Sequence, residues 1–223
     1  MNNKTVWAFG GKDKSWIRDV CAGYDTTFFG RDNVDYSDVT GFINSCVSPP
    51  DIIVYNINNA GHDPDYEKVI TSDDHFKKLH DIINSTYRFQ LNLMEWLFGN
   101  FENKRVMWIT SMEPYNMCPA ENLNDGDYHG DILLYRQVRA LEHQAIHQQN
   151  IKPSNVKKYN SALGVCVANN REDIPTKLNS ILKEDLFDYG VVGIEDDCPM
   201  TSSELYAVKG SIIRINLKGT SRH

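Results

Sequence analysis

The chain has 223 residues, of which 41% are hydrophobic and 24% charged, and its formal net charge is −7 at pH 7. These values are typical of a soluble globular protein, so we expect one domain spanning residues 1–223. The negative charge argues against a nucleic-acid partner, because phosphate binding needs a basic surface. No apolar run approaches transmembrane length, so we expect no membrane partner.

The five cysteines are scattered along the chain without C-x-x-C spacing. This pattern argues against a disulfide framework or a zinc site, and we expect no bound metal. The amino terminus also lacks the apolar core of a signal peptide. Both observations favour a reducing, cytoplasmic location.

Strands and helices alternate along the sequence. The predicted strands are Thr5–Phe9, Asp25–Phe29, Ile52–Tyr55, Arg105–Thr110, Ser161–Ala168 and Ser211–Leu217. The predicted helices are Ser15–Val20, Val39–Val47, Asp73–Phe98, Asp131–Gln149 and Ile174–Phe187. This alternation predicts an α/β fold, a doubly wound Rossmann-like three-layer sandwich with a mostly parallel central sheet.

The central strand lies in the stretch Asp51–Gly61, which reads D-I-I-V-Y-N-I-N-N-A-G. Its four consecutive apolar residues are typical of a strand that is buried on both faces of a parallel sheet. Small residues, Ala60 and Gly61, follow the strand and would let a ligand approach the backbone. Because ligands bind at the carboxyl ends of strands in such sheets, this stretch predicts the floor of a nucleotide site.

The first strand runs into Gly10-Gly11, followed by Lys12 and Lys14. Glycines between a strand and a helix let backbone N–H groups face a pyrophosphate, and the lysines could contact it by charge. A simple tight turn is about as consistent with two glycines taken alone. We therefore keep both interpretations of this turn.

The second strand ends at Gly30-Arg31. An acidic residue at this point hydrogen-bonds the ribose of NAD, whereas an arginine accepts the 2′-phosphate of NADP. Arg31 therefore favours NADP over NAD. The alternative is that Arg31 is an exposed loop cation.

Candidate catalytic residues follow in order along the chain. Asn84 interrupts the apolar stripe of the long helix, so it either faces solvent or has a polar role. Ser111 ends a strand at the same predicted sheet edge as the central strand. Tyr135 and Arg139 are four residues apart and share a helix face, where the cation could lower the pKa of the phenol. A half-buried tyrosine beside an exposed arginine is the competing interpretation.

Taken together and in order, these residues resemble the short-chain dehydrogenase/reductase family. The resemblance covers nearly the whole chain, and its most specific motif is Asn58-Asn59-Ala60-Gly61. The other matches are the turn Gly10-Gly11, the motif Asp38-Val39-Thr40, Asn84 upstream of Ser111, Tyr135 with Arg139, and the stretch Tyr206–Ile213. Arg139 stands where the family has a lysine.

The resemblance implies hydride transfer between NADP(H), or NAD(H), and a small-molecule carbonyl or alcohol. It implies that Ser111 holds the substrate carbonyl, that Tyr135 donates the proton and that Asn84 supports a water in the proton relay. Arg139 would supply the positive charge beside Tyr135. A homodimer or homotetramer is also implied.

The resemblance also implies the contacts of the cofactor. Asp38 and Val39 would touch the adenine, and Asn59 would stabilise the edge of the central strand. The full predicted cofactor set is Gly10, Gly11, Lys12, Arg31, Asp38, Val39, Asn58, Asn59, Ala60 and Gly61.

Two further functions remain open. A catalytically silent nucleotide-binding or scaffold protein would explain the sparse glycines and Arg139, which cannot relay a proton as a lysine does. A sugar-nucleotide reductase or epimerase would fit the long interval between Ser111 and Tyr135. The segment from Gly193 to Tyr206 is a predicted lid, and nothing in it names the substrate.

His143 and His147 are four residues apart on a predicted helix and could share a metal ion. No third ligand stands at a recognisable spacing. We therefore expect these two histidines to lie on an exposed polar face.

Overall fold

The structure is a computed structural model that describes residues 4–10, 15–57, 72–110, 130–151, 159–167, 174–187, 190–194 and 212–215. Within these ranges, the side chains of residues 15, 72–75, 130–136, 151, 194 and 212–215 are not described.

One parallel sheet forms the centre of the described chain. Its strands are β1 (Thr5–Phe9), β2 (Asp25–Phe29), β3 (Ile52–Tyr55), β4 (Arg105–Thr110), β5 (Ser161–Cys166), β6 (Val191–Ile194) and β7 (Ile212–Ile215). Their order is β2-β1-β3-β4-β5-β6-β7, and every pair of neighbours is parallel. The predicted doubly wound α/β fold is confirmed.

Strand β6 is the element that the sequence did not predict. It reads V-V-G-I and pairs with β5 and β7, in the region where we expected a lid from Gly193 onward. A run of only four residues that contains a glycine gives little strand signal. Its position becomes clear only from the strands on either side.

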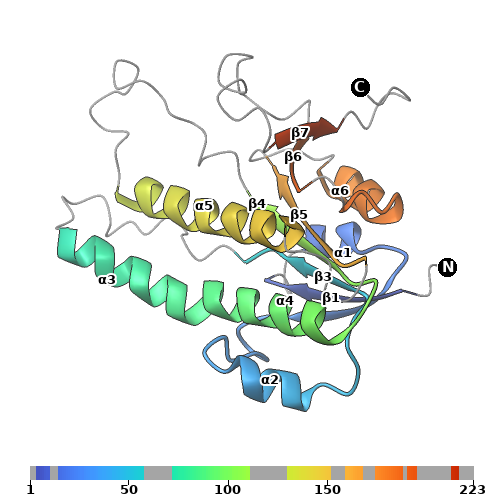
Figure 1. Ribbon diagram of the computed structural model, residues 1–223, viewed down its shortest axis with the longest axis horizontal. Helices are drawn as coiled ribbons and strands as arrows, with labels where there is room; N and C mark the ends of the chain where they lie inside the picture. The colour runs from blue at the N-terminus through green and yellow to red at the C-terminus, as the bar shows by residue number, and fades with distance from the viewer. Residues whose placement is uncertain are drawn as a thin grey trace.

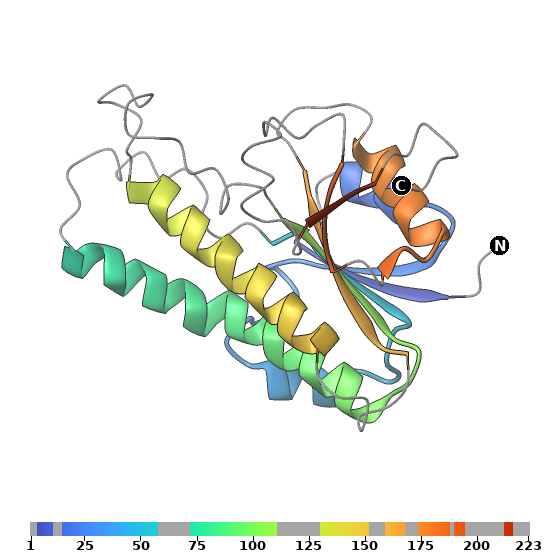
Figure 2. The same ribbon diagram turned by 45° about the horizontal axis from the view of Figure 1, so that its top comes forward.

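Two helical layers cover the sheet (Figure 2). Helices α4 (Arg88–Asn100) and α5 (Gly130–Ile151) lie on one face with α2 (Val39–Ser45), whereas α1 (Ser15–Val20) and α6 (Ile174–Lys183) lie on the other. Figure 1 shows the three-layer arrangement from a second side. Crossovers between parallel strands require these intervening helices.

The predicted long helix is continuous but changes its hydrogen-bonding pattern. It consists of α3 (Ser72–Ile82), the π-helical turn η2 (Ile83–Tyr87) and α4. A π-helical turn inserts extra backbone into the helix and occurs frequently at functional sites. Here η2 contains Asn84, the asparagine that the sequence singled out.

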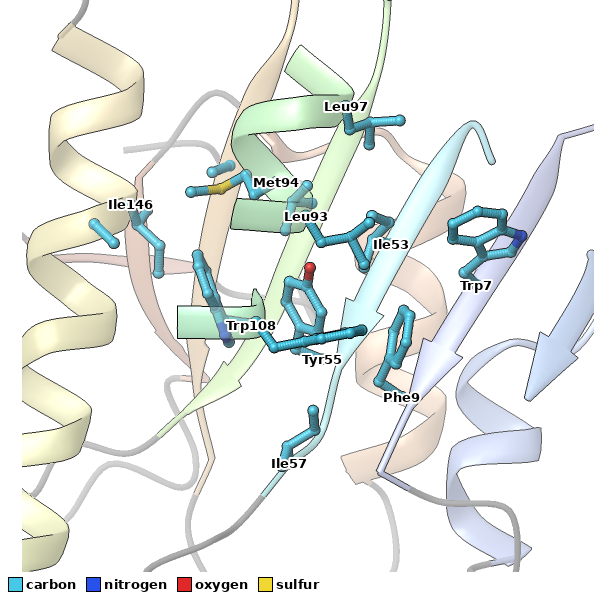
Figure 3. Packing of buried hydrophobic residues seen from close by; sticks show 14 of the residues in the cluster. Trp7, Phe9, Ile53, Tyr55, Ile57, Leu93, Met94, Leu97, Trp108 and Ile146 are labelled. Carbon is cyan, nitrogen blue, oxygen red and sulfur yellow. The ribbon is translucent and has the colours of Figure 1, made fainter. Parts of the chain in front are cut away.

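The two faces of the sheet differ in composition. The face under α4 and α5 carries a cluster of aromatic side chains that includes Trp7, Phe9, Tyr55 and Trp108 (Figure 3). The hydroxyl of Tyr55 donates a hydrogen bond to the backbone O of Gln90 at 3.0 Å, so the only polar atom of this ring is paired with α4. The opposite face is mainly aliphatic.

The ends of β1 and β3 are pressed together at the point where the strand order reverses. Gly10 follows β1 with φ of +88°, and a Cβ there would lie 2.2 Å from the backbone O of Asn56. The N–H of Gly10 also donates to Phe29 O at 2.9 Å, which ties the same turn to β2. Only glycine fits this position, for both its φ and its lack of a side chain.

We predict that Gly10→Ala destabilises the protein by about 2–5 kcal/mol, the sum of a positive-φ penalty and a backbone clash. Gly23 is the matched control, because its φ is +92° but nothing lies within 4 Å of a Cβ there. Gly23→Ala should cost only the conformational penalty of about 1–2 kcal/mol. Chemical denaturation measures both values. Equal losses for the two variants would contradict the tight contact between β1 and β3.

Candidate functional site

The carboxyl ends of the parallel strands gather at one edge of the sheet. Gly10, Gly30, Asn56 and Thr110 lie at or directly after the ends of β1, β2, β3 and β4. The chain turns to opposite sides of the sheet between β1 and β3, because β2 lies on one side of β1 and β3 on the other. In doubly wound sheets the ligand crevice lies at such a switch point.

Asn56 is the first polar residue after β3. Its Nδ2 is buried and has no hydrogen-bond partner among the described residues. Its backbone N–H donates to Phe9 O at 2.9 Å, which fixes the backbone of Asn56 to the end of β1. A buried amide donor without a partner costs free energy, so a ligand acceptor at the switch point would stabilise it.

A pocket of about 720 Å³ adjoins the carboxyl end of β2. The loop after β2 forms one wall, and the end of α3 with η2 forms the other. The lining residues are Arg31, Asp32, Asn33, Val34, Asp35, Tyr36, Asp81, Ile82, Ser85 and Thr86. This is the side of the sheet on which a Rossmann-type fold binds the adenosine half of a dinucleotide.

The walls of the pocket are anchored to the aromatic core. The ring of Tyr36 packs edge-on against Phe89 of α4 at 5.1 Å between centroids. Burial raises the pKa of Tyr36 to about 12, with smaller opposing effects of Arg31 and Asp32. The Asp35 carboxylate accepts bonds from the Ser37 hydroxyl and N–H, which hold its pKa below the ordinary value. The pocket therefore carries carboxylates beside its arginine.

Asp38 and Val39 do not line this pocket. Asp38 caps α2, since its Oδ1 accepts the N–H of Gly41 at 2.8 Å. Val39 packs against the aromatic cluster. The structure thus gives the D-V pair a local role as a helix start.

A chain of buried polar groups joins α5 to the end of β4. Nη1 of Arg139 donates to both carboxylate oxygens of Glu142, at 2.9 and 2.8 Å. Oε2 of Glu142 also lies 3.0 Å from Oγ1 of Thr110, the last residue of β4. The Arg139 and Glu142 residues are only 5% and 1% exposed. Burial raises the pKa of Glu142 above its ordinary value, although the charge and hydrogen bonds of Arg139 and the Thr110 hydroxyl act in the opposite direction. Because both oxygens of Glu142 face donors, the hydrogen-bond geometry favours its ionised form.

His143 extends this chain. Its Nε2 lies 3.0 Å from Thr110 Oγ1, and the residue is 3% exposed. The Thr110 hydroxyl has one proton, which the carboxylate of Glu142 requires, so Thr110 accepts from an Nε2–H of His143. Burial, followed by the charge of Arg139, lowers the pKa of His143 to about 3. The histidine is therefore neutral at pH 7.

The prediction of an exposed face for His143 and His147 is wrong for His143. His147 is half-buried, and burial lowers its pKa as well. Their helix packs against β4 and β5, and this packing brings His143 into contact with Thr110 of β4. Among the described residues, no group of three or more metal-ligating side chains is present.

Asn84 lies exposed on η2 and does not line the pocket. Its Nδ2 donates to His80 O at 3.0 Å and lies 2.9 Å from His80 Nε2. This is the backbone contact one turn earlier that a helical asparagine makes when it faces solvent. A role in a proton relay stays a prediction.

Several predicted site residues lie outside the described part of the chain. These are Gly11, Lys12, Asn58, Asn59, Ala60, Gly61 and Ser111. Tyr135 lies in α5, but its side chain is not described. The residue before Ser111 and the residue one turn after Tyr135 are nevertheless linked through Glu142. Sequence reasoning missed Thr110 and Glu142, and the Thr110–Ser111 junction at a strand end was the one available signal.

A scan against protein-family models finds no match, and neither does a search of curated proteins. Solved structures do match. A Burkholderia multivorans protein described as a short-chain alcohol dehydrogenase has 10% identity and a TM-score of 0.58, over 86% of this chain and 96% of that chain. A carbonyl reductase from Pseudomonas aeruginosa PAO1 has 13% identity and a TM-score of 0.52, and the match covers 86% of this chain and 85% of that chain. LigD from Sphingobium sp. strain SYK-6 has 12% identity and a TM-score of 0.52, and the match covers 95% of this chain and 98% of that chain.

At these identities the similarity establishes the architecture. The chain has the fold of the short-chain dehydrogenases/reductases, as the resemblance in its sequence predicted. Within the described residues, no helix is both long and apolar enough to span a membrane.

We predict that the protein loses stability as the pH falls below about 6.5 because of His143. The folded pKa of His143 is about 3, so between these values the unfolded chain binds a proton that the folded chain excludes. The free energy of unfolding should fall by up to about 1.4 kcal/mol per pH unit from this residue. His143→Gln should reduce this slope in urea titrations carried out between about pH 3 and 6.5, the window set by the folded and unfolded pKa values of His143. Identical slopes for the two proteins would contradict a buried neutral imidazole.

Proposed function

We propose that this protein is a divergent short-chain dehydrogenase/reductase that binds a nicotinamide dinucleotide and transfers a hydride between it and a carbonyl or alcohol. The observation that carries the proposal is the pocket that follows the carboxyl end of β2, the strand next to β1 in the sheet. Arg31, singled out by the sequence for a nucleotide, lines that pocket. The shared fold with an alcohol dehydrogenase and a carbonyl reductase supports the substrate class.

The described residues fit such a dinucleotide at three points. Gly10 provides the tight turn out of β1 that brings the next backbone groups to a pyrophosphate. Asn56 offers a buried amide donor at the switch point. The pocket beside Arg31 and Tyr36 would hold the adenosine half.

The charge of the pocket bears on the choice between NAD and NADP. Arg31 taken alone favours the 2′-phosphate of NADP, as the sequence suggested. The described lining, however, also contains three carboxylates, from Asp32, Asp35 and Asp81. Carboxylates accept hydrogen bonds from ribose hydroxyls and repel a phosphate. We therefore propose that the protein prefers NAD(H), with NADP(H) as the weaker ligand.

Ser111 and Tyr135 would act on the substrate. When bound, the reduced nicotinamide supplies a hydride for the carbonyl carbon. Ser111 holds the carbonyl oxygen, and Tyr135 donates its phenolic proton to that oxygen to give the alcohol. The phenolate then takes a proton from water, which restores the site.

A catalytically silent nucleotide-binding protein is the second candidate. The observation that favours it is the ion pair between Arg139 and Glu142, since a guanidinium that is paired with a carboxylate offers less net charge to a neighbouring phenol. This candidate requires dinucleotide binding without turnover.

We predict that calorimetry detects binding of NADH and weaker binding of NADPH. Asp32→Asn should raise the affinity for NADPH by about threefold to fivefold, because it removes one surface repulsion of up to about 1 kcal/mol. Arg31→Ala is the matched control, which should weaken NADPH more than NADH. No binding of either dinucleotide would exclude the proposed function, and tighter binding of NADPH than of NADH would exclude the proposed preference.

We also predict reductase turnover with aldehydes or ketones in the presence of NADH. Tyr135→Phe should lower kcat by about 100-fold or more, because the proton donor is lost while the ring is kept. The affinity for NADH, measured in parallel, should stay unchanged. Dinucleotide binding without any turnover across a carbonyl panel would favour the silent candidate.

A further inference from the structure

Two hydroxyl side chains of η2, from Ser85 and Thr86, line the pocket that follows β2. The Ser85 hydroxyl donates to the backbone O of Asp81 at 2.7 Å, and its Oγ lies 3.2 Å from Oγ1 of Thr86. A hydroxyl has one proton and two lone pairs. Because the Ser85 proton is used on Asp81 O, the proton between the two hydroxyls comes from Thr86. Oγ1 of Thr86 therefore offers lone pairs, and no proton, to a ligand.

The remainder of the η2 wall also lacks hydrogen-bond donors. Its other two lining residues are Asp81, whose carboxylate accepts hydrogen bonds, and Ile82, which is apolar. The side-chain donors of the described lining lie on the opposite wall, in the loop after β2, and come from Arg31, Asn33 and Tyr36. The wall formed by η2 therefore suits a ligand group that donates hydrogen bonds.

Contacts with the core fix the η2 wall in place. Thr86 is only 5% exposed, and the hydroxyl of the next residue, Tyr87, donates to Leu141 O of α5 at 3.1 Å. Phe89, which follows in α4, packs against Tyr36 of the opposite wall. Because both walls contact the same core, a ligand has to match the acceptors that η2 presents.

The residues directly after β2 are those that meet the ribose in this type of fold, so the opposite wall would meet the base. Adenine carries an exocyclic amino group, which is a hydrogen-bond donor. We propose that Thr86 determines base specificity by accepting a hydrogen bond from this amino group. Ser85 is a positioning residue, because it holds the Thr86 proton away from the ligand. This inference rests on the proposed function, in which the pocket holds the adenosine half of the dinucleotide.

The test compares two dinucleotides that differ in the base alone. NADH carries the amino group, whereas reduced nicotinamide hypoxanthine dinucleotide has a carbonyl oxygen in its place. Calorimetry of the full-length protein should show that NADH binds at least about tenfold more tightly, because the carbonyl oxygen would face the lone pairs of Thr86. Thr86→Val should weaken the binding of NADH by about threefold to tenfold, the loss of one neutral hydrogen bond, and should reduce the preference. Thr86→Ser keeps the hydroxyl and should keep the preference.

Ser85→Ala distinguishes this arrangement from a general loss of packing. Ser85 is exposed, so the variant should fold, and it frees the Thr86 proton for the ligand. The affinity for the hypoxanthine dinucleotide should then rise by about threefold to tenfold, whereas a purely structural effect would lower both affinities. Ser180→Ala is the matched control, because the Ser180 hydroxyl of α6 also donates to a backbone O four residues earlier, that of Thr176 at 3.1 Å. It should leave both affinities unchanged.

Equal affinities of the unaltered protein for the two dinucleotides would overturn the inference. So would an unchanged preference in a folded Thr86→Val, or a hypoxanthine dinucleotide that binds no more tightly to Ser85→Ala. Failure of the proposed function appears separately, as absent binding of NADH or absent turnover. ADP and inosine diphosphate carry the same two bases without nicotinamide, so a Thr86-dependent preference for ADP would support the inference even then. Absent binding of all four nucleotides would overturn both.

Discussion

The close contact between the ends of β1 and β3 is the constraint on which the candidate site depends. At Gly10 the chain leaves β1 with no room for a side chain against the backbone of Asn56, and it bonds to β2 at the same turn. This contact sets the spacing of the two strands at the point where the sheet changes direction. A dinucleotide placed there would meet a fixed backbone on one side and the amide of Asn56 on the other.

The polar groups at this edge of the sheet fall into two sets, one that lines an accessible pocket and one that is buried. The pocket beside Arg31 is accessible and lined by charged loop residues, which suits a nucleotide with hydroxyl groups. The chain of polar groups formed by Arg139, Glu142, Thr110 and His143 is buried. We interpret the buried part as a support that holds α5 against β4, so that residues on the two elements keep a constant separation.

The fold could be predicted from the sequence because its strands are short apolar runs between helices of clear periodicity. The bounds of β1, β2 and β4 match the predicted ones. Strand β6 was not predicted because it has only four residues, one of which is a glycine. The π-helical turn η2 was not predicted because the apolar residues of the long helix continue through it at helical spacing.

The candidate site was predictable only in part. Arg31 and Arg139 were noticed as cations at meaningful positions, but their partners were not. Glu142 appears in the sequence as an ordinary charged helix residue, and its burial follows from the packing of α5 on β4, whose Thr110 is 32 residues away. The same packing buries His143, which the sequence alone assigned to solvent.

The most direct test of the account is a crystal structure of the protein with NADH. The account predicts electron density for the adenosine half in the pocket formed by the loop after β2 and the turn η2. It also predicts that the pyrophosphate of NADH lies at the turn after Gly10. A hydrogen-bond acceptor of the ligand should lie within hydrogen-bonding distance of Nδ2 of Asn56. A dinucleotide bound elsewhere, or side chains filling the crevice between β1 and β3 in crystals grown with saturating NADH, would contradict it.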